Sequence, residues 1–434
     1  MSAPALATAY VDVPRARPKA RPKPQSAAER LALTMLWLMG AACSLVFIEP
    51  SPYEIATLLA IATVAIAGLT LRPELLPLMF LLILTNIGYT VSSYFLLNET
   101  KILIWVITSW YLAFSAVFLA AALTTNTQAR LDMLMKGIVV AGVIAAIAGI
   151  VGYFRVIGAL NDLLLLYDRA RGTFKDPNVF GAFMVLPALI SLQYVISSRF
   201  WPSVRHAVLF GLFSAAVLLS FSRAAWGQLA FAAPMVLFLT FITSPSPNQR
   251  LRIVMLTIAG IGAVALFLAG LLSLEAVSNL LKERLSLNQS YDVGETGRFA
   301  RHVLGAVLAL DVPLGIGPMQ FPKIFPEDPH NSYLNAFMSG GWLAGVCYPT
   351  LVLVSLFYGM RAVSTRTPWQ RMTIVIYTAY FATMAESVII DSDHWRHAFM
   401  ILGLLWGLIV ASRAYASGGS PKGNAALAHP QPSS

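Results

Sequence analysis

The chain has 434 residues, of which 57% are hydrophobic and 12% are charged, and its mean hydropathy is +0.70. Soluble proteins carry about 25% charged residues, so this composition excludes an ordinary soluble domain and is typical of a protein that crosses a membrane many times. The net charge of +10 is explained better by basic loops on one membrane face than by nucleic-acid binding. Both cysteines, Cys43 and Cys347, lie in apolar runs and are interpreted as packing residues.

Residues 1–30 form a basic tail in which Arg15, Arg17 and Lys19 alternate with prolines. Proline at this density prevents helix and sheet, and like charges repel, so we expect an extended and mobile tail. Its charge favours the cytoplasmic side and a loose association with anionic lipids. We expect no cleavable signal peptide, because the first apolar run starts only at Leu31 and no small-residue cleavage site follows it.

Twelve apolar stretches follow the tail, and most have the 17–25 residues, roughly, of a membrane-spanning helix. The sequence therefore predicts an all-α polytopic membrane protein with about 12 transmembrane helices. Helices 1–9 fall within 31–274, one long extracytoplasmic loop occupies 275–331, helices 10–12 fall within 332–412, and 413–434 is a disordered cytoplasmic tail. The stretches are 31–48, 54–71, 75–97, 101–123, 137–154, 178–196, 204–221, 224–242, 252–274, 332–358, 372–390 and 398–412.

The charges of the connections support an even number of spans. With the N-terminus inside, every even-numbered connection is cytoplasmic and contains arginine, as the positive-inside rule requires. The outside connections should then be poor in arginine, yet four of them contain it. They are 155–177, the tight turn at 221–224, the long loop 275–331 and the segment 391–397. Arginines placed against the topological bias require a separate explanation.

The first candidates for anion binding lie in the first two of these connections. Arg223 follows one apolar stretch and opens the next with almost no loop, so its guanidinium must face protein, water or an anion, because exposure to lipid is costly. A snorkelling arginine at a helix end is the alternative. Arg169 and Arg171 frame a short loop, in which either can instead pair with Asp168 or Asp176.

The long loop contains the next candidates. Arg298–Leu310 is predicted to be an amphipathic helix that lies in the membrane interface. Arg298 at its first position opposes the helix dipole, but a helix start with its own arginine is a good anion site. Arg301 and His302 can share that role, and a contact with lipid headgroups is the alternative. Around this helix the sequence predicts a helix at 279–286, turns at 288–297 and 315–318, and an extended stretch to His330.

The segment Asp391–His397 contains two acids and two histidines. Such a set can bind a metal ion, and it includes an Asp-x-Asp pattern, but three letters match by chance too easily to carry that conclusion. We prefer a solvated loop that brings Arg396 close to the site, and we expect no metal and no other cofactor.

The candidate base is His330, which ends the longest polar interval and leads into an apolar segment. A histidine beside Asn331 and Ser332 at a membrane boundary can exchange protons at neutral pH, whereas the alternative is a turn with one of these neighbours as helix cap. Arginine recognises phosphate through bidentate hydrogen bonds. Together with a proton-accepting histidine, the arginines suit transfer of a sugar from a lipid diphosphate onto a hydroxyl, with diphosphate as leaving group.

Over residues 155–345 the sequence resembles the O-antigen ligase and Wzy-type polymerase superfamily of bacterial envelope glycan assembly. The similar motifs occur in the order of that superfamily. They are Arg171-Gly172-Thr173-Phe174 with Pro177-Asn178, then Ser222-Arg223, Gly297-Arg298, Pro313-x-Gly315-x-Gly317 and His330-Asn331-Ser332-Tyr333-Leu334.

The resemblance implies a GT-C-like fold in the bacterial inner membrane, with the active site on the periplasmic face. It implies an undecaprenyl-diphosphate-linked glycan as donor and metal-independent, inverting transfer to an acceptor glycan or lipid. Arg223 and Arg298 would hold the diphosphate and His330 would activate the acceptor hydroxyl. Membrane lipids and other polysaccharide-assembly proteins are the further partners expected. Additional substrate contacts are expected from Arg171, Arg169, Asn331, Arg301 and Arg396.

The motifs leave polymerase and ligase open. The ligase pattern is His-Asn, nine residues, Gly, two residues, then Gly, Thr or Tyr. His330-Asn331 and Gly341 fit this pattern, but Ala344 stands at its last position and Gly345 follows one place late. The Arg-x10-Gly pattern of polymerases does not align either. We favour a polymerase, with a ligase that attaches polymer to the lipid A core as the alternative.

Two other classes remain as rivals. A secondary transporter also has about twelve spans, but transporters place charges near the bilayer midplane and contain paired repeats. Here the charges lie at span ends, and Glu386 is the main intramembrane acid. A membrane scaffold without catalytic activity has no use for an ordered set of arginines on the outer face.

Overall fold

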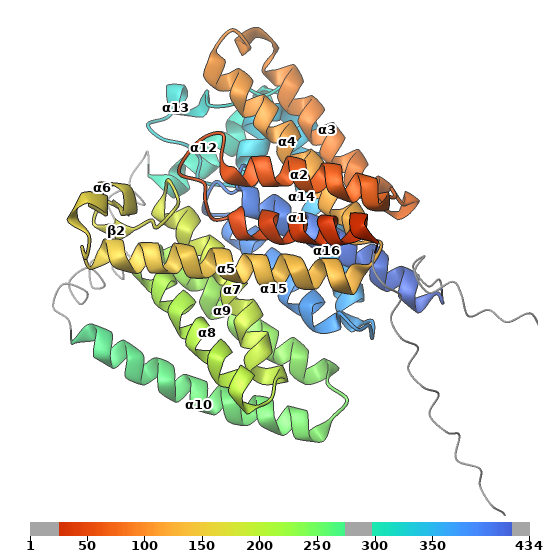
Figure 1. Cartoon of the computed structure of the whole chain (residues 1–434). Coiled ribbons are helices and arrows are strands. Elements are labelled where there is room, and N and C mark those ends of the chain that lie inside the picture. Colours follow the sequence, from red (N-terminus) through yellow and green to blue (C-terminus); the bar gives the residue numbers. More distant parts are fainter. Residues whose placement is uncertain (1–25, 274–296, 419–434) are drawn as a thin grey trace, which may run out of the picture.

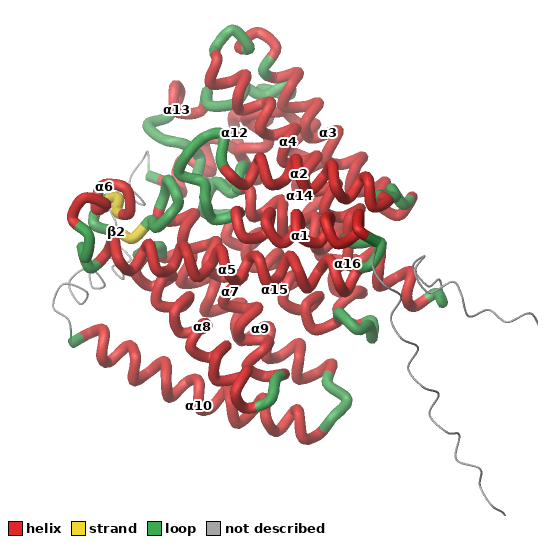
Figure 2. Tube along the Cα trace, viewed as in Figure 1, coloured by secondary structure: helices red, strands yellow, loops and turns green. Residues whose placement is uncertain are grey.

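A computed structural model describes residues 26–273 and 297–418. Within these ranges the chain is a bundle of packed helices (Figure 1), and its strands are one antiparallel pair, β1 (Leu165–Leu166) and β2 (Arg169–Ala170), as Figure 2 shows. The predicted mobile tail before residue 26, the helix at 279–286, the turns at 288–296 and the tail beyond residue 418 lie outside the described residues.

Each of the twelve apolar stretches coincides with a helix. Among the described residues nine helices are long and apolar enough to cross a membrane, which confirms the all-α polytopic fold. The other three are α1 (Ala27–Ala42), α2 (Pro52–Gly68) and α15 (Gln370–Glu386), with 16 or 17 residues each. The nine are α3 (Leu76–Ser92) with η1 (Pro73–Leu75) before it, α4 (Thr100–Ala122), α5 (Thr127–Tyr153), α7 (Pro177–Ser197), α8 (Phe200–Leu219), α9 (Arg223–Thr243), α10 (Pro247–Leu272), α14 (Ser332–Ser364) and α16 (Arg396–Ala416).

The helices differ widely in burial. In its most apolar stretch of 18 residues, α16 buries 89% of the residues and α7 buries 78%. The same share is 6% in α10, which lies at the edge of the bundle in Figure 1. The core is therefore built around α7 and α16, with α14 packed along α3 and α1 along α5. Cys43 and Cys347 are free and buried, in agreement with packing roles.

The predicted amphipathic helix is α12 (Arg298–Asp311), and its prediction is confirmed. One face is buried at Arg301, Gly305 and Ala309. The opposite face exposes Phe299, Val303, Val307 and Leu310, each more than half exposed. Such a face suits the acyl region below lipid headgroups.

Short helices fill the remaining connections, namely η2 (Tyr94–Leu96), η3 (Gly158–Leu160), α6 (Asn161–Leu164) and α13 (Phe321–Ile324). The prediction of an extended stretch up to His330 is wrong at α13. The buried ring of Phe321 stacks on Phe325 with centroids 4.5 Å apart, and this contact closes a helical turn that hydrophobic periodicity in so short a segment cannot predict.

The first third of α14 contains a break at Gly340–Gly341, and the second of these glycines has φ +64°. The loop Pro313–Gly317 replaces the hydrogen bonds that the break removes. The Met338 carbonyl accepts two backbone N–H groups of this loop at 2.7 and 3.1 Å, and the Trp342 N–H donates to the Pro313 carbonyl at 2.9 Å. The glycine motif that the sequence singles out thus docks a loop into a gap in a membrane helix.

At the end of the bundle away from the start of α1, ion pairs join loops that are distant in sequence. At the other end, Arg130 binds Glu29 at 2.7 Å, and both side chains are buried. The pairs at the first end are Lys175–Glu49, Lys323–Glu99 and Arg396–Glu54.

The break in α14 generates a stability prediction. A Cβ at Gly341 would lie 2.4 Å from the Pro313 carbonyl oxygen and would occupy a left-handed backbone conformation. Gly341→Ala should therefore cost roughly 1–3 kcal/mol from the backbone alone and lower the apparent unfolding temperature in detergent. Gly227→Ala is the control, because nothing lies within 4 Å of its Cβ position. Equal unfolding temperatures for the two variants would contradict the prediction.

Candidate active site

The candidate base lies where α14 begins. His330 is one-third exposed, and its Nδ1 is 3.2 Å from Oδ2 of Asp391, in the loop between α15 and α16. The backbone N–H of Asn331 donates to the other oxygen of the same carboxylate at 3.0 Å. The Asn331 side chain caps α14 by accepting the N–H groups of Tyr333 and Leu334, as the alternative interpretation of this segment predicted. Base and cap are therefore adjacent residues with separate roles.

Three fully buried serines hold the Asp391 loop against the start of α14. The Ser332 N–H donates to the Ser387 carbonyl at 2.8 Å. The Ser392 N–H donates to the Ser332 hydroxyl at 2.7 Å, and the hydroxyls of Ser387 and Ser392 are hydrogen-bonded to each other. Because these bonds fix both segments, the carboxylate of Asp391 is positioned before any substrate arrives.

This geometry assigns roles to the two nitrogens of the His330 ring. A carboxylate at Nδ1 favours the tautomer that carries its proton there and leaves Nε2 as the proton acceptor. The sequence analysis did not predict the contact of Asp391 with His330. Among the described residues no group of three or more His, Cys, Asp or Glu side chains could hold a metal ion. The sequence feature that could have indicated this contact is an acidic residue in the connection before the last helix.

Two side chains of α12 bind the segment that leads to His330. Arg301 is 2% exposed and its Nη2 is 2.8 Å from Oε2 of Glu327; this hydrogen bond lowers the pKa of Glu327. His302 donates from Nε2 to the Pro329 carbonyl at 2.7 Å, and burial lowers the pKa of His302. Arg301, an expected substrate contact, is thus held in an internal ion pair.

Arg298 shares the electrostatic environment of this segment. It lies one turn before His302 on the same face of α12, and its charge lowers the pKa of both His302 and Glu327. Burial and the charge of Asp391 raise the pKa of Asp328. Arg298 and the candidate base are therefore brought to one region, although 32 residues separate them.

Arg223 opens α9 directly after Ser222, whose hydroxyl accepts the Ala225 N–H at the start of the helix. Farther along α9, the Gln228 amide donates to the Thr383 hydroxyl of α15 at 2.8 Å. α9 and α15 run in opposite directions along this contact, so the start of α9 lies beside the end of α15. Arg223 is thus placed at the end of the bundle where the Asp391 loop begins.

Arg169 and Arg171 brace the outer loop 155–177. Arg169 donates to the Ser220 carbonyl at 2.8 Å and to Oδ1 of Asn178 at 2.7 Å. Asp168 is bound by Arg155, and the Asp176 side chain caps α7. Arg171 donates to three backbone carbonyls, those of Asp162, Leu163 and Lys175.

Arg396 opens α16 and connects it with the start of α2. Its Nε is 2.6 Å from Oε1 of Glu54, and its Nη2 is 3.5 Å from Oε1 of Glu49. Lys175 also binds Glu49, and this contact lowers the pKa of the Glu49 carboxyl. Arg396 therefore ties the start of the last helix to the connection between α1 and α2 and to the start of α2.

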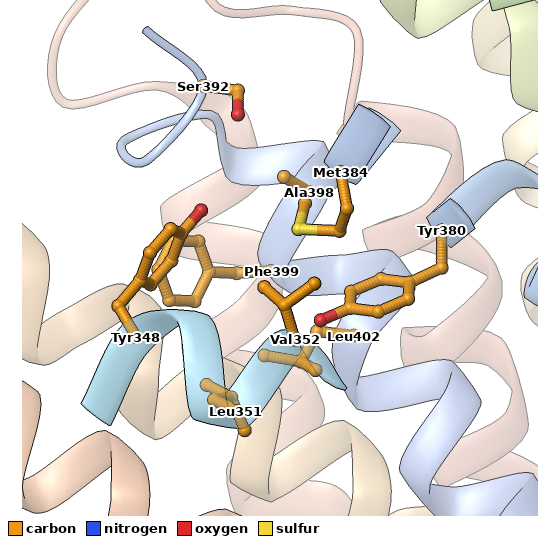
Figure 3. Close-up of a pocket in the computed structure, with 9 residues that line it drawn as sticks. All are labelled: Tyr348, Leu351, Val352, Tyr380, Met384, Ser392, Ala398, Phe399 and Leu402. Carbon is orange, nitrogen blue, oxygen red and sulfur yellow. The ribbon is translucent and has the colours of Figure 1, made fainter. Parts of the chain in front are cut away.

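A small pocket lies among α14, α15 and α16, below the loop that carries Asp391 (Figure 3). Its walls are apolar apart from the hydroxyls of Tyr348, Tyr380 and Ser392. No arginine or lysine lines it, so the pocket does not suit a diphosphate. We interpret it as a packing gap beneath the site.

The His330–Asp391 contact generates a kinetic prediction. In Asp391→Asn the side-chain oxygen can still accept the Asn331 N–H, but the carboxylate that favours the Nδ1–H tautomer of His330 is lost. Turnover of lipid-linked glycan should fall by as much as the roughly 10²–10⁴-fold that a general base contributes. Asp168→Asn is the control, since Asp168 is an exposed acid on another outer loop. Wild-type turnover in Asp391→Asn would refute a positioning role for this carboxylate.

Residues 207–348 match the family model of the O-antigen ligases. No curated protein matches the chain. The matched segment runs from α8 through the break in α14, and it contains Arg223, Arg298 and His330 but ends before Asp391. Over this third of its length the multi-pass membrane protein is similar to the O-antigen ligases, and this similarity supports the O-antigen ligase and Wzy-type polymerase superfamily that the sequence motifs predict.

Proposed function

We propose that the protein is a glycosyltransferase of the bacterial inner membrane. It transfers glycan from an undecaprenyl-diphosphate carrier to a sugar hydroxyl at the periplasmic face, with inversion at the anomeric carbon. The observation that carries the proposal is the 3.2 Å contact between His330 Nδ1 and Asp391 Oδ2. This contact lies at the start of α14, in the region that the positive charge of Arg298 in α12 influences. The match to the O-antigen ligases supports the same reaction class.

The reaction follows from the roles of the two ring nitrogens. Nε2 of His330 takes the proton of the acceptor hydroxyl while the hydroxyl oxygen attacks the anomeric carbon of the donor sugar. The bond between that carbon and the diphosphate oxygen breaks, and its electron pair leaves with the diphosphate. Asp391 stabilises the imidazolium that forms. Charge therefore develops at two positions, the imidazole ring and the leaving group.

The arginines would meet the charge of the leaving group. Arg223 and Arg298 present planar guanidinium groups that bind phosphate oxygens through paired hydrogen bonds. Arg298 stands at the first position of α12, where backbone N–H groups also favour an anion. Arg301 and Arg171 act indirectly in this proposal, because their hydrogen bonds hold α12 and the loop 155–177 in place.

We favour a polymerase over a ligase, since Ala344 departs from the ligase pattern. Ala344 is fully buried, and its Cβ faces Gly88 of α3. The two helices are so close there that a methyl group at Gly88 would lie 3.0 Å from the Ala344 Cβ. A threonine or tyrosine there would require α3 to move. The ligase reaction remains the second candidate, and the family description favours it.

Lipid-linked glycans from a deletion strain test the function. A missing polymerase should leave single repeat units on the undecaprenyl-diphosphate carrier, whereas a missing ligase should leave long polymer on it. A plasmid copy carrying His330→Ala serves as the matched control and should not restore the wild-type pattern. Wild-type carrier-linked glycans in the deletion strain would argue against both reactions and for another class, such as a transporter.

The proposed roles also predict a kinetic separation between His330 and the arginines. His330→Ala and His330→Gln should lower kcat by about 10²–10⁴-fold, because glutamine is no useful base, and should leave donor KM nearly unchanged. Arg223→Lys and Arg298→Lys keep the charge but lose the planar fork, so most activity should be lost through weaker donor binding.

In vitro transfer with purified lipid-linked donor measures both constants. Arg155→Lys is the control, because Arg155 is an exposed arginine of the outer loop paired with Asp168. Full activity in both lysine variants would move the diphosphate site elsewhere. Full activity in His330→Gln would remove His330 as the base.

A further inference from the structure

A second histidine–carboxylate pair lies on the loop that carries Asp391. His394 Nδ1 is 3.4 Å from Oδ2 of Asp393, and the same oxygen accepts the Asn335 side-chain amide at 2.9 Å. The Ser339 hydroxyl donates to the other end of that amide at 3.0 Å. Asp393 is 6% exposed. The reaction proposed above uses none of these four side chains.

These groups line one face of α14. Asn331, Asn335 and Ser339 are spaced by four residues, so they lie above one another on the helix and span about 12 Å. The stripe runs from His330 towards the break at Gly340–Gly341. Polar and charged groups this far inside a membrane protein are costly and typically serve a polar ligand or pathway.

An aromatic wall faces this stripe from α3 and α4. The rings of Trp105 and His394 lie with centroids 3.9 Å apart and planes tilted by 32°. Tyr89 meets Trp105 edge to face with centroids 5.0 Å apart. Nε2 of His394 is buried and has no hydrogen-bond partner among the residues that the structure describes, while Trp105 is only half-buried. A polar atom without a partner beside a partly open indole ring is suited to a ligand that has both hydroxyl groups and apolar C–H faces.

We propose that Asp393, His394 and Trp105 form a subsite for a neutral sugar unit of the acceptor glycan, an inference that rests on the proposed function. The carboxylate and the imidazole hydrogen-bond sugar hydroxyls, and the open part of the indole π face packs against the C–H face of the sugar ring. The cluster contains no arginine or lysine, and its carboxylate repels phosphate, so it does not take the carrier diphosphate.

The position of the subsite suits the acceptor. Three residues separate His394 from Asp391, so their Cα atoms are at most about 11 Å apart. A sugar bound at Trp105 therefore extends its neighbouring unit towards His330, where the attacking hydroxyl must lose its proton. The subsite thus orients the acceptor, and its residues need not touch the donor.

The probe is the free glycan released by mild acid from the carrier-linked repeat units of the same strain. It carries no diphosphate, so it reports sugar binding alone. Binding to the full-length protein in detergent is measured by saturation-transfer NMR and by inhibition of transfer. His394→Phe keeps a flat ring against Trp105 but removes both nitrogens, and Asp393→Asn can still accept the Asn335 amide. Each should weaken glycan binding at least about tenfold and leave binding of undecaprenyl diphosphate unchanged.

His206→Phe is the matched control. His206 also stacks on an aromatic ring, that of Tyr194 at 4.5 Å, and its buried Nδ1 also has no hydrogen-bond partner, but it lies in α8. Trp110→Phe is a second control on the helix of Trp105, since Trp110 is exposed and donates to Thr90. Both controls should bind the free glycan like the wild type.

Retained binding of undecaprenyl diphosphate shows that a variant is folded. Wild-type glycan binding in His394→Phe overturns the subsite, and so does normal binding combined with a loss of kcat, which would make His394 a base. The proposed function fails separately, if the wild-type protein transfers no glycan from the carrier. If the wild-type protein transfers glycan and the variants bind the free glycan as well as the wild type does, the subsite is wrong while the proposed function stands.

Discussion

The arrangement of the candidate site depends on the contacts of the Asp391 carboxylate. One oxygen meets the ring of His330 and the other accepts the backbone N–H of Asn331, so a single side chain joins the start of α14 to the connection between α15 and α16. Three buried serines fix that connection. A carboxylate bound from two directions is rigid, and a rigid carboxylate can hold an imidazole in one tautomer and one orientation.

The break in α14 makes this arrangement possible in a membrane. Backbone groups without partners are costly in lipid, so irregular backbone survives there only when other protein segments bind it. The loop Pro313–Gly317 binds the gap at Met338 and Trp342. The Trp342 indole also donates to the Ala309 carbonyl of α12 at 2.7 Å. The same feature therefore anchors the amphipathic helix that carries Arg298, and it links the diphosphate side of the proposed site to the base.

The arginines of the outer face divide into two groups with different tasks. Arg171 donates to three backbone carbonyls, Arg301 is buried against Glu327, and Arg396 binds two acids of the first helices. These side chains help to give the loops a fixed shape. Arg223 and Arg298 instead open helices at the end of the bundle where the Asp391 loop lies. Loops that are braced by the first group can present the second group to a substrate with little loss of entropy on binding.

The sequence by itself determined the all-α membrane fold, the twelve helices and the amphipathic α12, because lipid imposes long apolar runs and a charge bias that are visible residue by residue. It also identified Arg223, Arg298 and His330 as candidates. Only the tertiary structure decided that Asp391 is the partner of His330, 61 residues away, and that Asp393 and His394 face Asn335 and Trp105. A guanidinium that binds a backbone carbonyl and one that is proposed to bind a phosphate have the same local sequence signal, because the groups around each arginine come from distant parts of the chain and are brought together only by packing.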